Sequence, residues 1–215
     1  NKAKMTGVIN KMEKKVAVVT GASRGIGAAI ARELAAAGMY VVINYCGSEE
    51  KAQELKNALD VRIKSVGVFV NESPELICRL YDNGVIDYAQ LHGTENNNYI
   101  EALRSCCRIP IIKAFSVSGE RDAAEAERSC ADYILLDNGN GGTGKSFDWS
   151  FLSKIKRPYF LAGGLNSINI KDAVRSFRPY AVDVSSGAET NGFKDFSKMK
   201  FLIEAVRDDI LLHRQ

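Results

Sequence analysis

The sequence predicts an α/β fold in which short parallel strands alternate with helices, and the pattern suits a compact (βα)8 barrel. Eight short apolar runs recur along the chain, and each is followed by a helix or a helix-like stretch. Strands joined by helices run parallel through right-handed crossovers. Eight such units fit into the 215 residues. An open doubly wound sheet shows the same alternation, and periodicity alone does not separate the two.

Each expected strand is a short run of β-branched or other apolar residues. In chain order, the expected strands are Val16–Val19, Tyr40–Asn44, Ser65–Val70, Tyr88–Leu91, Ile109–Ala114, Asp132–Leu136, Tyr159–Ala162 and Ala181–Val184. Helices are expected where apolar residues recur at helical spacing or where helix formers dominate. They are Ile26–Ala37, Glu49–Leu59, a helix with Ser73 as N-cap and Pro74 in its first turn, Asn169–Phe177 and Lys198–Asp208.

Composition narrows the function classes. The apolar fraction of 46% and the charged fraction of 26% are ordinary for a soluble globular protein. The net charge of +3 is small and forms no basic stripe, so neither nucleic acid nor a membrane is an expected partner. No apolar run is long enough to cross a bilayer. Residues 1–13 are polar and lack periodicity, so we expect a loose leader there, not a signal peptide, and a single domain at 14–215.

The cysteine and histidine content argues against a metal site. The chain has five cysteines, an odd number without a CxxC pair, and only two histidines. We therefore expect no metal. We also expect reduced, mostly buried thiols, as in a cytoplasmic protein.

A glycine-rich loop near the N-terminus has the form of a dinucleotide-binding fingerprint. Residues 20–27 read TGASRGIG, where glycines would let the backbone approach a pyrophosphate. The stretch 14–50 resembles the opening of short-chain dehydrogenases, especially the 3-oxoacyl carrier-protein reductases. That family needs a catalytic Tyr followed four residues later by Lys, and none of the eight tyrosines has this neighbour. We therefore expect no cofactor, and interpret Gly21, Gly25 and Gly27 as vestigial.

A second glycine-rich stretch has the form of a P-loop. Residues 139–146 read GNGGTGKS and follow an expected strand. A P-loop leads into a long helix, whereas only a short one fits before Pro158. The carboxylate of Asp137 would also repel incoming phosphates. The stretch is better interpreted as a glycine loop over a barrel mouth, and nucleotide binding (NADP or P-loop) is the weakest functional hypothesis.

Six further motifs, in the right order, resemble the last six strands of phosphoribosylanthranilate isomerases. They are VGVFVN at 66–71, QLHG at 90–93, IKA at 112–114, LLD at 135–137 with GTGK at 142–145 and FDW at 147–149, AGGLN at 162–166, and VDVSSG at 182–187. The resemblance covers about residues 61–208. It implies a TIM-type barrel, an enzyme of tryptophan biosynthesis, and a small phosphorylated sugar substrate or phosphate ion as ligand.

The resemblance also assigns roles to residues. The family's reaction is an Amadori rearrangement, which needs an acid for the ring oxygen and a base for the proton on C2′. Asp137 takes the place of the general acid, at the carboxyl end of a strand where barrel enzymes carry out catalysis; a helix N-cap is its alternative role. The expected phosphate-binding residues follow strands seven and eight, and they are Gly163, Gly164, Ser185, Ser186 and Gly187.

Four of the matched positions have plainer structural roles as alternatives. Asp183 is expected to orient substrate hydroxyls or the anthranilate ring, but a polar residue in a barrel layer would look the same. Gly163 and Gly164 could form only a tight turn. His92 is expected to be structural.

Two positions depart from the family pattern. The family's first strand reads Lys-x-Cys-Gly with Cys as the general base, and VVTG at 18–21 puts Thr20 in that position. A threonine hydroxyl is too weak an acid to lose its proton at neutral pH, so it provides no alkoxide that could act as a base. The following loop, YCGSEE at 45–50, lacks the family's substrate-binding Arg. Cys46 in this loop is a candidate substitute base, or an incidental cysteine inherited from a reductase.

These observations predict a chimera, with a dehydrogenase-like βαβα piece at 14–59 and six isomerase-like βα units at 60–215. The leading hypothesis is an isomerase-type protein with weak or no catalysis. The alternatives are a competent isomerase that uses Cys46 or another base, and a recombined or engineered barrel without activity. We expect a monomer or a weak dimer. If the first quarter packs poorly, the fold would be an open three-quarter barrel with a loosely attached N-terminal piece.

Overall fold

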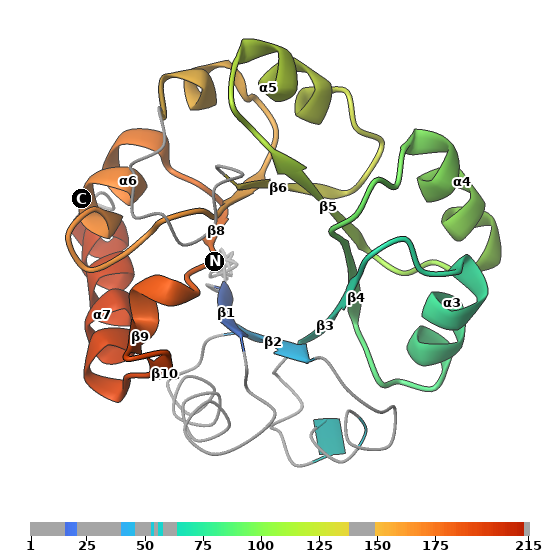
Figure 1. Cartoon of the computed structure of the whole chain (residues 1–215), viewed down its shortest axis with the longest axis horizontal. Helices are drawn as coiled ribbons and strands as arrows, with labels where there is room; N and C mark the ends of the chain where they lie inside the picture. The colour runs from blue at the N-terminus through green and yellow to red at the C-terminus, as the bar shows by residue number, and fades with distance from the viewer. Residues whose placement is uncertain are drawn as a thin grey trace, which may run out of the picture.

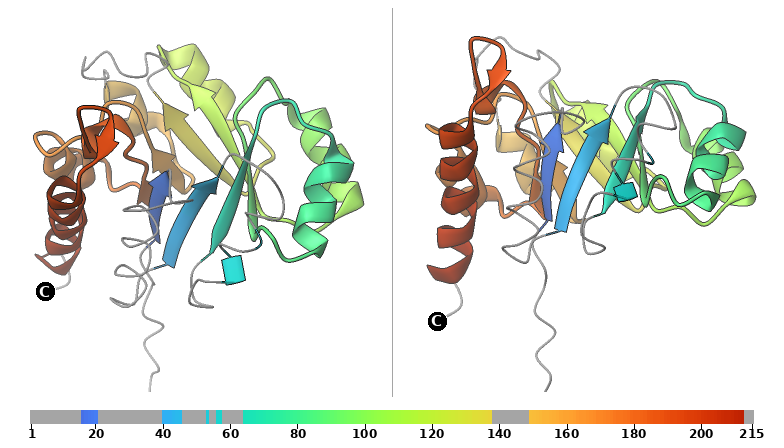
Figure 2. Two further views of the ribbon diagram at one scale, coloured as in Figure 1. Left: turned by 60° about the horizontal axis from the view of Figure 1, so that its bottom comes forward. Right: turned by 90° about the horizontal axis from the view of Figure 1, so that it is seen from below.

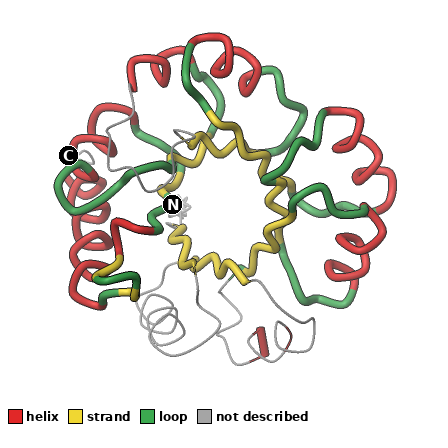
Figure 3. The backbone as a smooth tube through the Cα atoms, in the orientation of Figure 1, coloured by secondary structure: helices red, strands yellow, loops and turns green. Residues whose placement is uncertain are grey.

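The computed structural model of the chain describes residues 16–20, 40–45, 53, 56–57, 64–137 and 149–212. Eight parallel strands form one sheet in the sequential order β1-β2-β3-β4-β5-β6-β7-β8. The sheet curls into a ring with the helices outside it (Figure 1, Figure 3). Its two end strands, β1 and β8, lie in contact. A sequential order in a ring is a TIM-type barrel, because a doubly wound sheet reverses its strand order.

The strands agree closely with the runs expected from the sequence. Their bounds are β1 Val16–Thr20, β2 Tyr40–Tyr45, β3 Ser65–Phe69, β4 Tyr88–Leu91, β5 Ile111–Ser116, β6 Tyr133–Asp137, β7 Tyr159–Leu161 and β8 Ala181–Val182. A separate antiparallel hairpin joins β9 Glu189–Thr190 to β10 Phe193–Lys194. β1 and β2 are paired over their length and run side by side (Figure 2). This pairing favours the complete barrel over the three-quarter barrel.

β5 begins two residues later than expected, for a local reason. β5 starts at Ile111 and not at Ile109. Pro110 has no N–H to donate to the sheet, so the regular pairing of β5 begins after it. Its carbonyl accepts a hydrogen bond from the Ala89 amide at 3.0 Å.

The helices lie outside the strand ring. They are α3 Pro74–Asp82, α4 Asn97–Cys106, α5 Glu120–Glu127, η1 Trp149–Lys154, α6 Ile170–Phe177, η2 Ser186–Ala188 and α7 Phe196–Leu212. The Ser73 N-cap is confirmed, since its side chain accepts from the Leu76 amide at 3.4 Å, with Pro74 in the first turn. The expected helix at 26–37 lies outside the described residues. Among the described helices, none is both long and apolar enough to cross a membrane.

From β3 to β8, side chains alternate along the strands between the barrel interior and the helix layer. The outward residues pack under the helices; Leu91 of β4 and Leu136 of β6 are examples. The inward residues form one interior cluster, made of Val66, Ile112, Ala114, Leu135, Phe160, Ala162 and Ala181. Continuing the inward alternation to the carboxyl ends of the strands leads to His92, Asp137 and Asp183. On the side of β3 to β8 the interior is therefore filled with apolar side chains, and polar residues stand at its carboxyl-end mouth.

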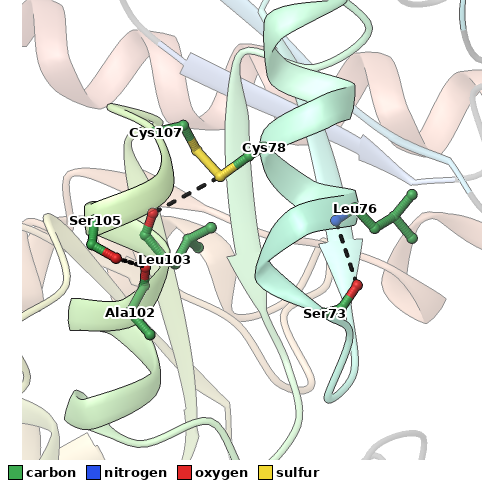
Figure 4. Close-up of a disulfide and its surroundings, with 7 residues drawn as sticks. All are labelled: Ser73, Leu76, Cys78, Ala102, Leu103, Ser105 and Cys107. Carbon is green, nitrogen blue, oxygen red and sulfur yellow. Dashed lines mark hydrogen bonds between the residues drawn. A yellow bond between two sulfur atoms is a disulfide. The ribbon is translucent and has the colours of Figure 1, made fainter.

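The structure corrects the expectation of reduced, mostly buried thiols. Cys78 on α3 and Cys107 directly after α4 are joined by a disulfide across a Cα–Cα distance of 5.5 Å (Figure 4). Cys106 is exposed and Cys130 is half-buried. The pair is 29 residues apart in sequence, and only the side-by-side packing of α3 and α4 brings the two sulfurs together. A search for CxxC spacing could not have found it.

Candidate active site

Asp137 is the last residue of β6, where it pairs in register with Ser116 of β5. It follows Leu135 of the interior cluster by two residues, so its side chain faces the mouth of the barrel. Its Oδ1 is buried and, within the described residues, has no hydrogen-bond partner. A buried unbonded carboxylate oxygen costs free energy, which makes the position a candidate for chemistry rather than for stability. Its alternative role as a helix N-cap involves residues 138–148, which are outside the described part.

Asp183 stands at the equivalent level of β8. Its amide donates to the carbonyl of Leu161 at 2.8 Å, so the backbone still follows the sheet one residue beyond Val182. Its Oδ1 is buried as well. Asp137 and Asp183 therefore bring two carboxylates to the mouth, from strands two places apart in the ring.

The loop after β7 is held in a conformation that needs glycine. Gly163 and Gly164 have φ angles of 84° and 69°, in the left-handed region that other residues rarely adopt. Side-chain amides of Asn166 and Asn169 donate to the carbonyl of Gly164 at 3.1 and 3.0 Å. A tight turn explains these contacts, and the turn also exposes backbone at the mouth.

The loops after β7 and β8 pack backbone against backbone at Gly187. A Cβ atom placed on Gly187 would lie 1.9 Å from the carbonyl oxygen of Leu165. Ser185 leads into the short 3-10 helix η2, which contains Ser186 and Gly187. The five residues expected to bind phosphate are thus brought into two touching loops at the carboxyl-end face of the barrel.

A buried ion pair fixes the loop after β4. The ammonium of Lys113 on β5 bonds the carbonyls of Leu91 and Gly93 at 3.2 and 2.7 Å, and Glu95 Oε2 at 3.1 Å. Glu95 also accepts from the amides of Asn71 at 2.6 Å and Gly93 at 2.9 Å. The loops after β3 and β4 are thus tied to each other and to strand β5.

The charge on Glu95 is stabilised by this surrounding. Burial raises the pKa of Glu95, but hydrogen bonds from the Asn71 amide and its own amide, together with Lys113, outweigh burial and hold the pKa below its usual value of 4.5. The sequence analysis missed this pair. The available signal was a lysine inside an otherwise apolar strand, IIKAF at 111–115, because such a charge is costly unless it is paired.

Comparison with known proteins decides the family. The sequence profile described as N-(5'phosphoribosyl)anthranilate (PRA) isomerase matches residues 28–205. The chain belongs to this family. The N-(5'-phosphoribosyl)anthranilate isomerase of Bacillus cereus (strain B4264) is 43% identical over 165 residues, which are 73% of this chain and 79% of that protein.

Solved phosphoribosylanthranilate isomerases share the fold over nearly the whole chain. The enzyme from Thermotoga maritima aligns with a TM-score of 0.76 and 32% identity, covering 91% of this chain and 99% of that one. A second structure holds reduced 1-(o-carboxyphenylamino)-1-deoxyribulose 5-phosphate, and it aligns with a TM-score of 0.73 and 31% identity over the same shares.

Of the other residues singled out in the sequence of this phosphoribosylanthranilate isomerase family member, the structure describes Thr20. Thr20 is the last residue of β1 and pairs with Asn44 of β2. Since all eight strands are parallel, Thr20 stands at the same end of the barrel as Asp137. Cys46 and the glycine loops at 21–27 and 139–146 lie outside the described residues.

Proposed function

We propose that the chain binds the phosphorylated sugar substrate of phosphoribosylanthranilate isomerases and presents Asp137 to it as general acid. The observation that carries this proposal is the buried Oδ1 of Asp137 at the end of β6, which has no hydrogen-bond partner among the described residues and lies at the same mouth as the loops of Gly163 and Gly187. A relative of the same fold holds a sugar 5-phosphate derivative. Backbone amides in loops after strands seven and eight are the usual phosphate site of a TIM-type barrel.

The proposed reaction is the Amadori rearrangement of tryptophan biosynthesis. An acid protonates the ring oxygen of the aminoaldose, and a base removes the proton from C2′ to give the aminoketose. A carboxyl oxygen without a competing partner in the described residues suits the acid, because it is left to contact the ring oxygen. Asp183 would orient substrate hydroxyls or the anthranilate ring from the β8 side.

The base is the weak part of the site. We infer from the motif resemblance that Thr20, the last residue of β1, takes the position of the family's catalytic Cys. A hydroxyl without an activating base is not a competent proton acceptor at neutral pH. We infer that catalysis is impaired or absent for this reason. Cys46, in the loop after β2, is the alternative base.

A chimeric origin would account for the difference between the sequence and structural matches. The Bacillus cereus relative aligns with 73% of this chain, the share that residues 60–215 make up, whereas the solved structures align with 91%. A foreign βαβα piece at 14–59 that preserved the fold would leave such a gap. The family profile nevertheless begins at residue 28, so it extends into the dehydrogenase-like piece. On this interpretation residues 14–215 fold as one domain. The second candidate function is then none at all, because the chain would be a recombined barrel without activity.

A steady-state assay tests the proposal. Freshly prepared phosphoribosylanthranilate is mixed with the protein, and the loss of its fluorescence is followed. Asp137→Asn removes the acid, and Asp82→Asn makes the same change at an exposed position on α3. Calorimetric titration with the reduced sugar 5-phosphate analogue measures binding separately.

The outcomes separate the candidates. Binding of the analogue with turnover no higher than that of Asp137→Asn supports the impaired isomerase. Turnover that Asp137→Asn abolishes shows a competent site, and Cys46→Ser is then the next variant. Failure of the analogue to bind contradicts the proposal and leaves the inactive barrel.

A further inference from the structure

We propose that Gln90 is a positioning residue that holds His92 in one tautomer, with its Nε2–H available at the barrel mouth to donate to the carboxylate end of the substrate. The use of His92 for substrate binding rests on the proposed function. The tautomer itself does not, and it can be measured without substrate.

The two side chains share one face of β4. Tyr88 packs against the interior cluster, so Gln90 and then His92 follow on the inward side at two-residue spacing. Gln90 is only 5% exposed, whereas His92 is exposed at the mouth. The His92 amide donates to the carbonyl of Phe69 at 2.8 Å, which keeps its backbone in the ladder between β3 and β4.

The contact between them assigns the proton. Gln90 Nε2 lies 2.8 Å from His92 Nδ1. An amide nitrogen can only donate, so Nδ1 accepts. A neutral imidazole with an accepting Nδ1 carries its proton on Nε2, and that nitrogen is the one left to a ligand.

The surrounding network keeps His92 in place. The carbonyls of Leu91 and Gly93, one on each side of His92, are both bonded by the buried ammonium of Lys113. Glu95 binds the Gly93 amide as well. The loop therefore has little freedom to move when Gln90 is changed, and a change in the His92 tautomer can be attributed to Gln90.

Ring geometry indicates which end of the substrate His92 meets. In the sequential ring of eight strands, β4 lies across the mouth from β8 (Figure 1). A phosphate held by the loops of β7 and β8 directs the other end of the molecule toward β4. In the ligand of the solved relative, that other end is an o-carboxyphenylamino group. A neutral N–H donor suits its carboxylate, because bonds to a charged acceptor are the stronger ones.

Nitrogen NMR tests the tautomer directly. The chain has only two histidines, His92 and His213, so ¹⁵N-histidine labelling gives two imidazole patterns, and His213→Gln assigns them. We expect His92 to be protonated on Nε2. Gln90→Glu offers an acceptor at the same place and should move the proton to Nδ1. Gln90→Met keeps the size without a polar group, guards against a buried-charge folding defect, and should give mixed tautomers.

Binding of the reduced sugar 5-phosphate analogue provides the second readout. We expect Gln90→Met to weaken its affinity about tenfold, as for the loss of one oriented hydrogen bond to a charge. Gln53→Met is the matched control, since Gln53 bonds only Asn57 in the described structure and that contact is exposed, and it should change neither readout.

The results discriminate clearly. A wild-type His92 protonated on Nδ1 overturns the proposal, whatever binds. An Nε2 proton together with equal affinity in wild type and Gln90→Met overturns the role in binding. An Nε2 proton in a protein that does not bind the analogue at all refutes the proposed function and leaves the action of Gln90 on His92 intact.

Discussion

Replacing Lys113 with methionine should destabilise the protein by about 3 kcal/mol, because it strands a buried carboxylate. The side chains of Lys113 and Glu95 are 6% and 1% exposed. The three protons of the Lys113 ammonium are matched by three acceptors, Glu95 and two backbone carbonyls. Methionine retains the length and removes all three bonds.

The magnitude follows from these contacts. Breaking a buried ion pair by removing one partner costs about 3–5 kcal/mol. A cavity of about 590 Å³ between α4 and α5 is lined by both residues and admits water beside them, which places the cost at the lower end. For a protein of this size, about 3 kcal/mol corresponds to a fall in Tm of roughly 6–12 °C.

Urea unfolding of three variants measures the effect. Lys154→Met makes the same change in the exposed pair Lys154–Glu120, whose side chains are 55% and 68% exposed, and it should cost about 0–1 kcal/mol. Adding Glu95→Gln to Lys113→Met should recover part of the loss, since the buried charge is gone. If Lys113→Met costs no more than Lys154→Met, the reasoning about the buried pair is refuted.

Four further predictions concern the pH dependence of stability, the ion pairs of Asp87, the phosphate loops and the disulfide. Because the folded pKa of Glu95 is lowered, its stabilisation is fully present above the usual value of 4.5 and is lost as pH falls through the folded pKa; Glu95→Gln should flatten this acid limb of the urea midpoint. Asp87 accepts from the Ser65 amide at 2.8 Å and pairs with Lys56 and Lys64, so Asp87→Asn should lower the free energy of unfolding by about 1–3 kcal/mol, and an unchanged urea midpoint would argue against it. Gly187→Ala must displace the Leu165 carbonyl and should weaken the binding of inorganic phosphate in calorimetry, whereas Gly119→Ala, with open space around it, should not. Without reductant, three of the five cysteines should react with a thiol reagent in denaturant, and Cys78→Ser should raise this to four; five reactive thiols in the wild type would contradict the disulfide.

Strand positions could be predicted well because buried strands are short runs of apolar residues, which are visible in the sequence. Tyr88–Leu91 matches β4 in both bounds. The predicted start of β5 at Ile109 was wrong because Pro110 interrupts the hydrogen bonding of the strand. The β9–β10 hairpin was missed, although Asn191 and Gly192, with φ angles of 53° and 79°, are a hairpin signal in the sequence. The hairpin was missed because the prediction assumed that each strand is followed by a helix, and β9 leads directly into β10.

The site was predictable only where one residue carries one role. Asp137 could be placed from its position at the end of an apolar strand. The Lys113–Glu95 pair depends on a strand side chain that meets a side chain of the neighbouring loop. Gln90 and His92 share one face of β4 at two-residue spacing, but that spacing does not show that the two side chains bond. The Cys78–Cys107 bond depends on neighbouring helices. Spacing along the chain does not show the ion pair or the disulfide, because both arise where neighbouring units of the barrel pack together.

The most direct test of the central claim is the turnover of Thr20→Cys with phosphoribosylanthranilate. If the barrel retains its acid and phosphate loops and lacks only the base, this change should raise kcat at least about 100-fold, the usual contribution of a positioned general base, and Asp137→Asn should abolish the gain. A wild type that already turns over as fast as Thr20→Cys, or a Thr20→Cys variant that binds the reduced analogue but stays inactive, would contradict the account.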